Sequence, residues 1–329
     1  MRAYCVDMQQ VPLGNTGVSV SALCYGTMSF GGDADAAMSE RLYKRCREAG
    51  INFFDCANVY AGGDSERILG KLMKAERDDL VITSKVGFGQ GDFNSRGLSR
   101  KAIVANCEAS LERLGTDYLD VYFCHTNDSK TPMEQTLRAL DDLVAAGKIL
   151  YPAASNWPAW EVALSLGVCE REGFAKFEVM QPMYNLVKRQ AEVEILPLCE
   201  AKNIAVIPYS PLGGGLLSGK YTTKQKDDAG RLSTNKMYAK RYGDERVFDI
   251  AEQFTQLANE MGHHPATLAV AWVGSHPAVT APIIGARNLE QLEPSLKAAE
   301  LNLTAEQRDA ISALSPEPPP ATDRSEERG

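Results

Sequence analysis

Short apolar runs alternate with amphipathic stretches along most of the chain. This alternation is typical of strands and helices wound around a parallel sheet. Helical patterns at 38–50, 99–115 and 133–148 lie between apolar runs, and the last two carry a glycine suited to a C-terminal cap. Eight runs are predicted to be strands: 22–26, 52–55, 80–84, 119–124, 149–154, 177–180, 204–207 and 279–284.

Eight parallel strands, each followed by a helix, predict an α/β fold that closes into a (β/α)8 TIM barrel. An open doubly wound sheet is disfavoured because residues 26–32, after the first strand, do not form a G-x-G-x-x-G turn. Two short alternating runs around 14–17 predict an N-terminal β-hairpin that plugs the lower end of the barrel. The long stretch 208–278 predicts an extended loop and helix insertion between strands 7 and 8. We expect residues 1–314 to form one domain and the proline-rich tail 315–329 to be disordered.

Composition narrows the function classes without naming one. The chain has 329 residues, 44% hydrophobic and 24% charged, with a net charge of -8, so it lacks the basic footprint of a nucleic-acid-binding protein. It shows no signal-peptide pattern and no run of 18 or more apolar residues, which predicts a cytoplasmic protein without a membrane partner. The eight cysteines include no C-x-x-C pair and predict neither a disulfide framework nor a zinc knuckle. The sequence leaves the oligomeric state open.

Four polar residues lie at or just beyond predicted strand ends. Asp55 ends the second strand, Lys85 follows the third and His125 follows the fourth, while Tyr60 lies in the loop after Asp55. In a barrel, residues that perform chemistry belong at the carboxyl ends of strands, so all four are expected to face one rim.

Strand alternation separates these residues from nearby cysteines. If Asp55 and His125 point into the barrel, Cys56 and Cys124 point outward beneath the helices. A metal site built from these cysteines with the aspartate and histidine is therefore not expected.

The four residue types together suit the polarisation of a carbonyl group. A phenol has a pKa of about 10. An adjacent ammonium group such as that of Lys85 favours the phenolate and lowers this pKa by about 1 to 3. Asp55 is placed to hold that ammonium group charged and oriented. His125 is suited to act as a second donor that positions a carbonyl oxygen or helps to move its proton.

These residues, in DCANVY, ITSK and VYFCH, resemble the catalytic tetrad of the aldo-keto reductases, and the resemblance extends from residue 13 to about residue 296. It implies that the chain reduces an aldehyde or ketone to the alcohol with hydride from a nicotinamide cofactor, usually NADPH. Tyr60 is then the general acid, with Lys85 and Asp55 as its partners.

The cofactor side fits the same family pattern. Ser155, Asn156 and Gln181 lie at strand ends, where they would hold the nicotinamide amide, and Tyr209 matches the aromatic residue on which the ring stacks. The resemblance implies that the following loop, which includes Ser210, Pro211, Leu212, Gly213, Gly215 and Lys220, approaches the pyrophosphate.

The glycine loop also satisfies most of a Walker A pattern. Tyr221 stands where that motif needs a Ser or Thr, and no amphipathic helix follows, so a P-loop is not predicted.

A glycine turn at 285 leads into a helix start that favours a phosphate. Arg287 suits an adenosine 2'-phosphate and no acidic residue sits in the same turn, so NADPH is favoured over NADH. Gln291 fits the family pattern along this helix, whereas Pro294 and Ser295 depart from it. The predicted cofactor set is Gly26, Thr27, Met28, Asp55, Ser155, Asn156, Gln181, Tyr209, Ser210, Pro211, Leu212, Gly213, Gly215, Lys220, Gly285, Arg287, Gln291 and Ser295.

The substrate is expected to be a small carbonyl compound with some apolar bulk. Tyr60 and His125 would contact its carbonyl group, and Phe30 and Phe88 are predicted substrate contacts. Met28 and Trp157 are further possible lining residues, although Trp157 is equally able to pack beneath the rim. No metal is predicted.

Two other readings of the same barrel stay open. One is a Schiff-base aldolase with Lys85 as the nucleophile. The other is a non-catalytic nicotinamide-binding subunit of a partner protein. His263 and His264, beside Gly262 and Pro265, indicate a helix junction rather than a metal site.

Overall fold

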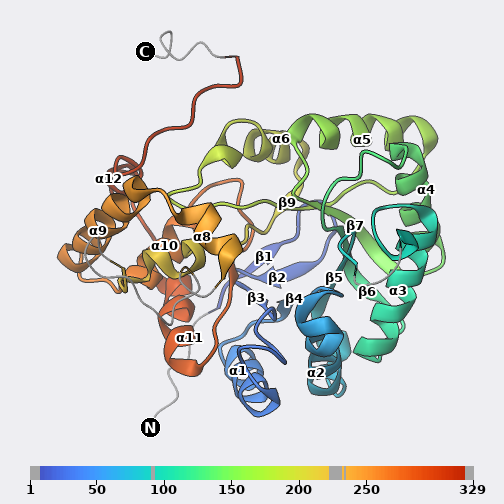
Figure 1. The fold of residues 1–329 in the computed structure, drawn as a ribbon, viewed down its shortest axis with the longest axis horizontal. Coiled ribbons are helices and arrows are strands. Elements are labelled where there is room, and N and C mark those ends of the chain that lie inside the picture. Colours follow the sequence, from blue (N-terminus) through green and yellow to red (C-terminus); the bar gives the residue numbers. More distant parts are fainter. Residues whose placement is uncertain (1–7, 90–92, 222–231, 233–234, 323–329) are drawn as a thin grey trace.

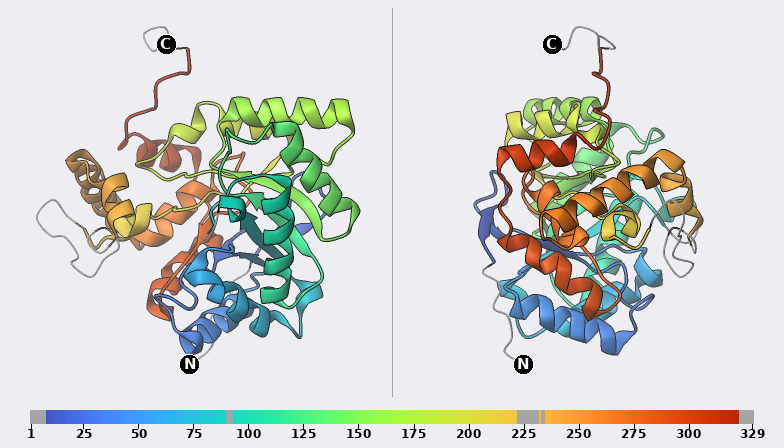
Figure 2. Two further views of the ribbon diagram at one scale, coloured as in Figure 1. Left: turned by 45° about the vertical axis from the view of Figure 1, so that its right-hand side comes forward. Right: turned by 90° about the vertical axis from the view of Figure 1, so that its left-hand side faces the viewer.

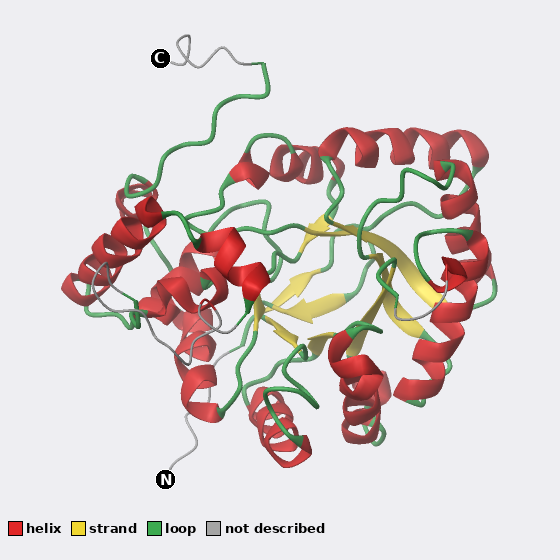
Figure 3. Ribbon diagram, in the orientation of Figure 1, coloured by secondary structure: helices red, strands yellow, loops and turns green. Residues whose placement is uncertain are grey.

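A computed structural model describes residues 8–89, 93–221, 232 and 235–322. Its centre is an eight-stranded parallel sheet with helices on the outside (Figures 1 and 3). The strands are neighbours in the order β10-β3-β4-β5-β6-β7-β8-β9. Their bounds are β3 (Cys24–Gly26), β4 (Phe53–Asp55), β5 (Val81–Val86), β6 (Leu119–Cys124), β7 (Ile149–Ser155), β8 (Val179–Gln181), β9 (Ala205–Val206) and β10 (Ile283–Ile284).

The sheet closes on itself. The backbone N–H groups of Thr280 and Ile283 donate to the carbonyl oxygens of Val206 and Pro208, at 2.8 and 2.9 Å, and so join the segments of β9 and β10. The predicted (β/α)8 barrel is therefore confirmed. The eighth strand is shorter than predicted because only Ile283 and Ile284 pair with β3, and Pro282 just before them has no N–H group to donate.

Strand alternation divides the core into two layers. Phe53, Val121 and Phe123 belong to the cluster inside the barrel, whereas Phe54 and Tyr122 belong to the cluster between the sheet and the helices. This period of two is the expected one for strands buried on both faces. It also places Cys56 and Cys124 in the outer cluster, as the sequence predicted.

The predicted N-terminal hairpin consists of β1 (Gln10–Pro12) and β2 (Ser19–Ser21), paired antiparallel with Val11 opposite Val20. Leu13 and Val20 are fully buried in the cluster inside the barrel. Gly14 has a positive φ of 55°, and a Cβ there would lie 2.8 Å from the carbonyl oxygen of Asn203. The hairpin thus plugs the lower end of the barrel.

Helices surround the sheet, and the segment before β10 adds several more. Helices α8, α9 and α10, coloured yellow to orange, lie together at one side of the barrel in the turned views of Figure 2. His264 caps α10 by accepting from the N–H of Ala266, so the histidine pair marks a helix junction as predicted. The helices are α1 (Ala36–Glu48), α2 (Asp64–Met73), α3 (Arg100–Leu114), α4 (Met133–Ala145), α5 (Ala159–Glu172), α6 (Ile195–Lys202), α8 (Lys236–Tyr242), α9 (Glu245–Glu260), α10 (Pro265–Gly274), α11 (Leu289–Leu296) and α12 (Ala305–Ser312).

Pro152 occupies a central strand, β7, without breaking it. It pairs with Tyr122 of β6, and its carbonyl oxygen accepts from the N–H of Glu178. The N–H and C=O of one residue point to the same neighbouring strand, so the missing N–H faces the β8 side, where pairing begins only at Val179. The proline therefore stands where no ladder donor is needed.

Some expectations fall partly outside the described residues. Cys5, the middle of the insertion at 222–231 and the last part of the tail, 323–329, are among the positions that the structure does not describe, and the disorder of the tail stays a prediction. The seven cysteines within the described ranges are buried and free. None of the helices in those ranges is long and apolar enough to cross a membrane.

Candidate active site

The four residues singled out at strand ends meet at one rim of the barrel. Asp55 is the last residue of β4, Lys85 lies within β5 rather than after it, and His125 follows β6 directly. Tyr60 opens the short 3-10 helix η1 (Tyr60–Gly63) after β4. Asp55, Tyr60 and His125 line a cavity of about 840 Å³, and Lys85 lies beneath its floor.

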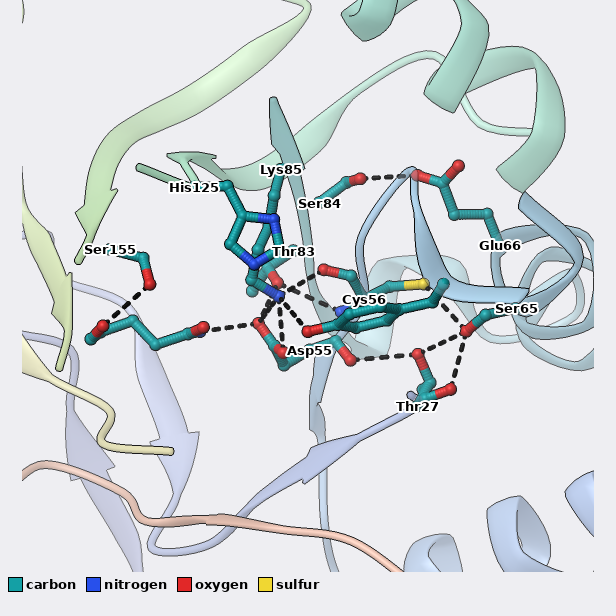
Figure 4. Close-up of polar contacts among 12 residues, drawn as sticks. Thr27, Asp55, Cys56, Ser65, Glu66, Thr83, Ser84, Lys85, His125 and Ser155 are labelled. Atoms are coloured by element: carbon teal, nitrogen blue, oxygen red, sulfur yellow. Dashed lines mark hydrogen bonds and ion pairs between the residues drawn. The ribbon is translucent and has the colours of Figure 1, made fainter. Parts of the chain in front are cut away.

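Lys85 and Asp55 form a buried ion pair. Nζ of Lys85 lies 2.7 Å from each carboxylate oxygen of Asp55, 2.6 Å from the carbonyl oxygen of Cys56 and 3.4 Å from the hydroxyl of Tyr60 (Figure 4). Burial, the largest single effect, would lower the pKa of Lys85, but the charge of Asp55, the nearby phenol of Tyr60 and the hydrogen bonds to Asp55 together outweigh it and hold that pKa above its ordinary value. The side chain therefore stays an ammonium group that reaches the phenol of Tyr60.

Asp55 is held by two further donors that the sequence did not assign to it. The hydroxyl of Thr83 and Nε2 of Gln181 both donate to its Oδ1 at 2.8 Å. Thr83 lies two residues before Lys85, so both point into the barrel from β5. The period-two pattern was the available signal for Thr83, whereas the approach of Gln181 depends on the curvature of the sheet.

The balance of forces on Tyr60 differs from the sequence expectation. Burial raises the pKa of Tyr60 to about 12, because desolvation outweighs the lowering by the charge of Lys85. The nearby ammonium group does favour the phenolate, as expected, but the net shift is upward. A phenol with this pKa keeps its proton at neutral pH and is a donor, with Lys85 in reach of the phenolate that remains after donation.

His125 is a neutral imidazole at the same rim. Burial, with a smaller effect of Lys85, lowers the pKa of His125 to about 3. Its ring lies 6.3 Å from the ring of Tyr60 and 4.8 Å from that of Phe88, both edge-on. Its buried Nδ1 has no hydrogen-bond partner among the described residues. The ring is thus able to present one donor to an oxygen in the cavity without carrying charge.

The residues expected to hold an amide-bearing ring lie on the adjacent wall. The hydroxyl of Ser155 donates to the carbonyl oxygen of Gln181, and Nδ2 of Asn156 donates to that of His125. The hydroxyl of Tyr209 donates to Oδ1 of Asn156 at 2.7 Å. Ser155 and Gln181 end strands β7 and β8 instead of following them, and all these side chains line the cavity.

Most of the predicted cofactor residues line this cavity, but three do not. Thr27 is fully buried, with its hydroxyl donating to the carbonyl oxygen of Asp55. Gly213 and Ser295 are also buried away from the wall. Those that line it are Gly26, Met28, Asp55, Ser155, Asn156, Gln181, Tyr209, Ser210, Pro211, Leu212, Gly215, Lys220, Gly285, Arg287 and Gln291.

An acidic side chain shares the cavity wall with Arg287, contrary to the expectation from the sequence. Arg287 lines the cavity, as expected, but so does Glu290 in the first turn of α11. The expected absence of an acidic residue beside Arg287 therefore does not hold for the cavity wall. Pro294 also contributes to the wall, whereas the hydroxyl of Ser295 is buried without a partner among the described residues.

Of the predicted apolar lining residues, two line the cavity and two are buried elsewhere. Met28 and Phe88 are 38% and 47% exposed and line the cavity. Phe30 is fully buried against Tyr25, and Trp157 packs edge-on against Phe177 at 5.2 Å. The prediction of Phe30 as a lining residue is therefore wrong, and Trp157 takes the alternative position beneath the rim.

Sequence reasoning missed the wall formed by α8. Met237, Tyr238 and Arg241 of this helix line the cavity. A Cβ on Gly214 would lie 2.5 Å from the ring of Tyr238, so α8 packs directly on the glycine loop η5 (Gly213–Ser218). The sequence predicted a helix in this insertion, but nothing in the local pattern indicated which face would meet the barrel.

The cavity fits a nicotinamide dinucleotide in its donor set. Amide and hydroxyl groups lie beside Tyr209 near the four strand-end residues, and Lys220 and Arg287 add two basic side chains to the same cavity. Gly214 and Gly215 have φ values of 70° and 103°, a backbone conformation that suits residues without a Cβ. No group of three or more His, Cys, Asp or Glu that suits a metal ion occurs in the ranges that the structure describes.

A family model and several relatives match most of the length of this chain. The model of the aldo/keto reductase family matches residues 22–316. A probable voltage-gated potassium channel subunit beta of Oryza sativa subsp. japonica is 36% identical over 96% of this chain and 99% of its own length. Uncharacterized oxidoreductase YrpG of Bacillus subtilis is 36% identical over 94% and 97%, and versiconal hemiacetal acetate reductase of Aspergillus parasiticus is 33% identical over 91% and 95%. The chain therefore belongs to the aldo/keto reductase family.

Proposed function

We propose that this protein reduces an aldehyde or ketone to the alcohol with NADPH and that Tyr60 donates the proton. The observation that carries the proposal is the contact of Lys85 with both Asp55 and Tyr60 at the floor of the cavity. The family and its reductase-named members support NAD(P)H-dependent carbonyl reduction in general terms.

The roles of the side chains follow from their charges. The cofactor supplies hydride to the carbonyl carbon. The hydroxyl of Tyr60 and the neutral ring of His125 donate to the carbonyl oxygen, and Tyr60 gives up its proton as negative charge develops there. Lys85 stabilises the resulting phenolate, and Asp55 keeps Lys85 charged and in place.

The preference for NADPH over NADH rests on Arg287. A guanidinium group binds a phosphate bidentately and suits the 2'-phosphate of NADPH. Glu290 on the same wall opposes this preference, because a carboxylate accepts from a free ribose hydroxyl and repels a phosphate. We propose NADPH as the cofactor, with a preference that depends on the balance of these two side chains.

The test follows the oxidation of NADPH in the presence of a panel of aromatic and aliphatic aldehydes. We expect turnover by the wild type and a loss of about 10²-fold or more in kcat for Tyr60→Phe. Tyr118→Phe is the matched control, because it removes a phenol whose ring lies against Arg77, away from the cavity. Equal rates for Tyr60→Phe and the wild type would exclude the proposed role.

A Schiff-base aldolase is disfavoured by the state of Lys85. A nucleophilic lysine must lose its proton, whereas the pKa of Lys85 is held above its ordinary value by Asp55. Borohydride treatment with a carbonyl substrate is expected to leave Lys85 unmodified.

A cofactor-binding role for a partner protein is suggested by the relatives named as potassium channel subunits. The same assay separates it from the leading proposal. Tight NADPH binding without turnover of any carbonyl compound in the panel would favour the subunit role.

A further inference from the structure

A second polar cluster lies on the outer face of β5, behind the ion pair of Lys85 and Asp55. Ser84 points outward, opposite to its neighbour Lys85, and its hydroxyl donates to Oε1 of Glu66 at 2.5 Å. Nε of Arg113 donates to Oε2 of Glu66, also at 2.5 Å. The Glu66 side chain is 0% exposed, so this carboxylate is shielded from water and held by Ser84 and Arg113; Figure 4 shows its contact with Ser84.

Glu66 lies at the start of the helix that follows the turn carrying Tyr60. It is in the first turn of α2, and η1, which opens with Tyr60, leads directly into that helix. Ala61, Gly62 and Gly63 all have positive φ values of 47°, 65° and 97°. A left-handed conformation is unfavourable for alanine, so the surrounding structure must hold this turn in place.

The first turn of α2 is fixed on two sides. The hydroxyl of Ser65 donates to the carbonyl oxygen of Thr27 at 2.8 Å, and the hydroxyl of Thr27 donates to the carbonyl oxygen of Asp55. On the other side Glu66 binds Ser84. A Cβ on Gly63 would lie 2.9 Å from Cδ of Arg113, so the arginine stem also rests against the turn itself.

Each face of β5 therefore carries a side chain that bonds to a residue beside the turn at 61–63. On the inner face Lys85 reaches Tyr60 across 3.4 Å, and on the outer face Ser84 binds Glu66, just beyond the same turn. A shift of α2 relative to β5 would change the distance between Nζ of Lys85 and the hydroxyl of Tyr60. The outer bond opposes such a shift, and a buried carboxylate is a stiff anchor because loss of a partner leaves a charge unpaired.

We propose that Glu66, held by Ser84 and Arg113, is a positioning residue that sets the place of Tyr60 relative to Lys85. This inference rests on the proposed role of Tyr60 as proton donor. Glu66 touches neither substrate nor cofactor, so it acts on the rate of proton transfer and not on binding.

The test compares Ser84→Ala and Glu66→Gln with the wild type in single-turnover reduction of an aromatic aldehyde by NADPH. We expect the rate to fall by about 10- to 100-fold, because a displacement of about 1 Å is enough for such a loss. The dissociation constant of NADPH should stay within about twofold. The solvent deuterium isotope effect on the rate should rise, since proton transfer then limits the reaction, and a purely structural role would not change it.

Two controls make the outcomes distinct. Ser110→Ala removes a hydroxyl from the same cluster, on α3, without breaking the bond between Glu66 and Ser84, and should keep the wild-type rate and isotope effect. Folded Ser84→Ala and Glu66→Gln with the wild-type rate and isotope effect would overturn the inference. A wild-type rate for Tyr60→Phe would instead overturn the proposed function, whatever the result for Glu66.

Discussion

Removing the counter-ion of Lys85 with Asp55→Asn is expected to destabilise the protein strongly. The two side chains are 0% and 3% exposed and meet at 2.7 Å. Loss of one partner from such a buried pair costs about 3 to 5 kcal/mol, because the other charge remains in the interior. The new amide oxygen can still accept from Thr83, so we expect a reduced free energy of unfolding and not a collapse of the barrel.

The dependence of this loss on pH identifies its cause. In the wild type the pKa of Lys85 is above its ordinary value, so the folded and unfolded states both bind the proton at neutral pH. The contribution of Lys85 is then constant and is lost only as the pH rises above about 10.4, through the folded-state pKa. In Asp55→Asn burial dominates and lowers the pKa of Lys85. Between the lowered pKa and about 10.4 the unfolded state binds more protons, so the stability of the variant rises with pH, by up to about 1.4 kcal/mol per pH unit.

The assay is urea unfolding of the wild type and Asp55→Asn from about pH 6 to about pH 9.5. Groups that titrate alike in both proteins cancel in the difference between their free energies of unfolding. Asp120→Asn is the matched control, since it removes the partner of Arg77 from a pair 11% and 12% exposed, near the start of β6. A guanidinium group keeps its proton throughout this range, so the control should lose stability by a constant amount. A constant loss for Asp55→Asn as well would show that Lys85 remains protonated without its partner and would refute the reasoning.

Three further predictions concern the cavity. Arg287→Met should raise the dissociation constant of NADPH by about tenfold and leave that of NADH nearly unchanged, whereas Glu290→Gln should weaken NADH more than NADPH; fluorescence titration with both cofactors checks this. His125 has its pKa lowered to about 3, so kcat should show no imidazole titration between about pH 5 and 8, and His125→Gln should lower kcat by about 10²-fold without changing the profile. Gly214→Ala, at a φ of 70° and with its Cβ 2.5 Å from the ring of Tyr238, should displace α8 and weaken NADPH binding measurably, with little change in the KM of the aldehyde.

The barrel and its rim could be predicted because local patterns carry them. Apolar runs give the strands, and Asp55 and His125 stand out as polar residues at the ends of such runs. The bounds were less certain: Lys85 and Ser155 lie inside strands because polar side chains are tolerated in β5 and β7 where they face the cavity floor or wall. Phe30 looked like a lining residue from its place in the first loop, but the ring packs inward against Tyr25, which sequence spacing does not reveal.

Residues that act through distant partners could not be found in this way. Glu66 follows Asp64 and Ser65 at the start of an amphipathic helix, where a carboxylate is usually solvated and favourable near the N-terminus. Only the packing of α2 against α3 brings Arg113 to it and excludes water. The wall formed by α8 is missed for the same reason, because its contact with the glycine loop is set by the tertiary fold.

The alternation of β5 gives the proposed catalytic and supporting roles a common origin. A strand buried on both faces must satisfy every polar side chain within the protein, since water reaches neither side. Lys85 on the inner face is satisfied by Asp55 and approaches Tyr60, and Ser84 on the outer face is satisfied by Glu66. Both neighbours therefore bind the segments that flank the same turn, one from each side of the sheet. If the proposed roles are right, Lys85 and Glu66 hold the turn that carries the phenol from opposite faces of β5, and a change on the outer face should therefore alter the rate of proton transfer.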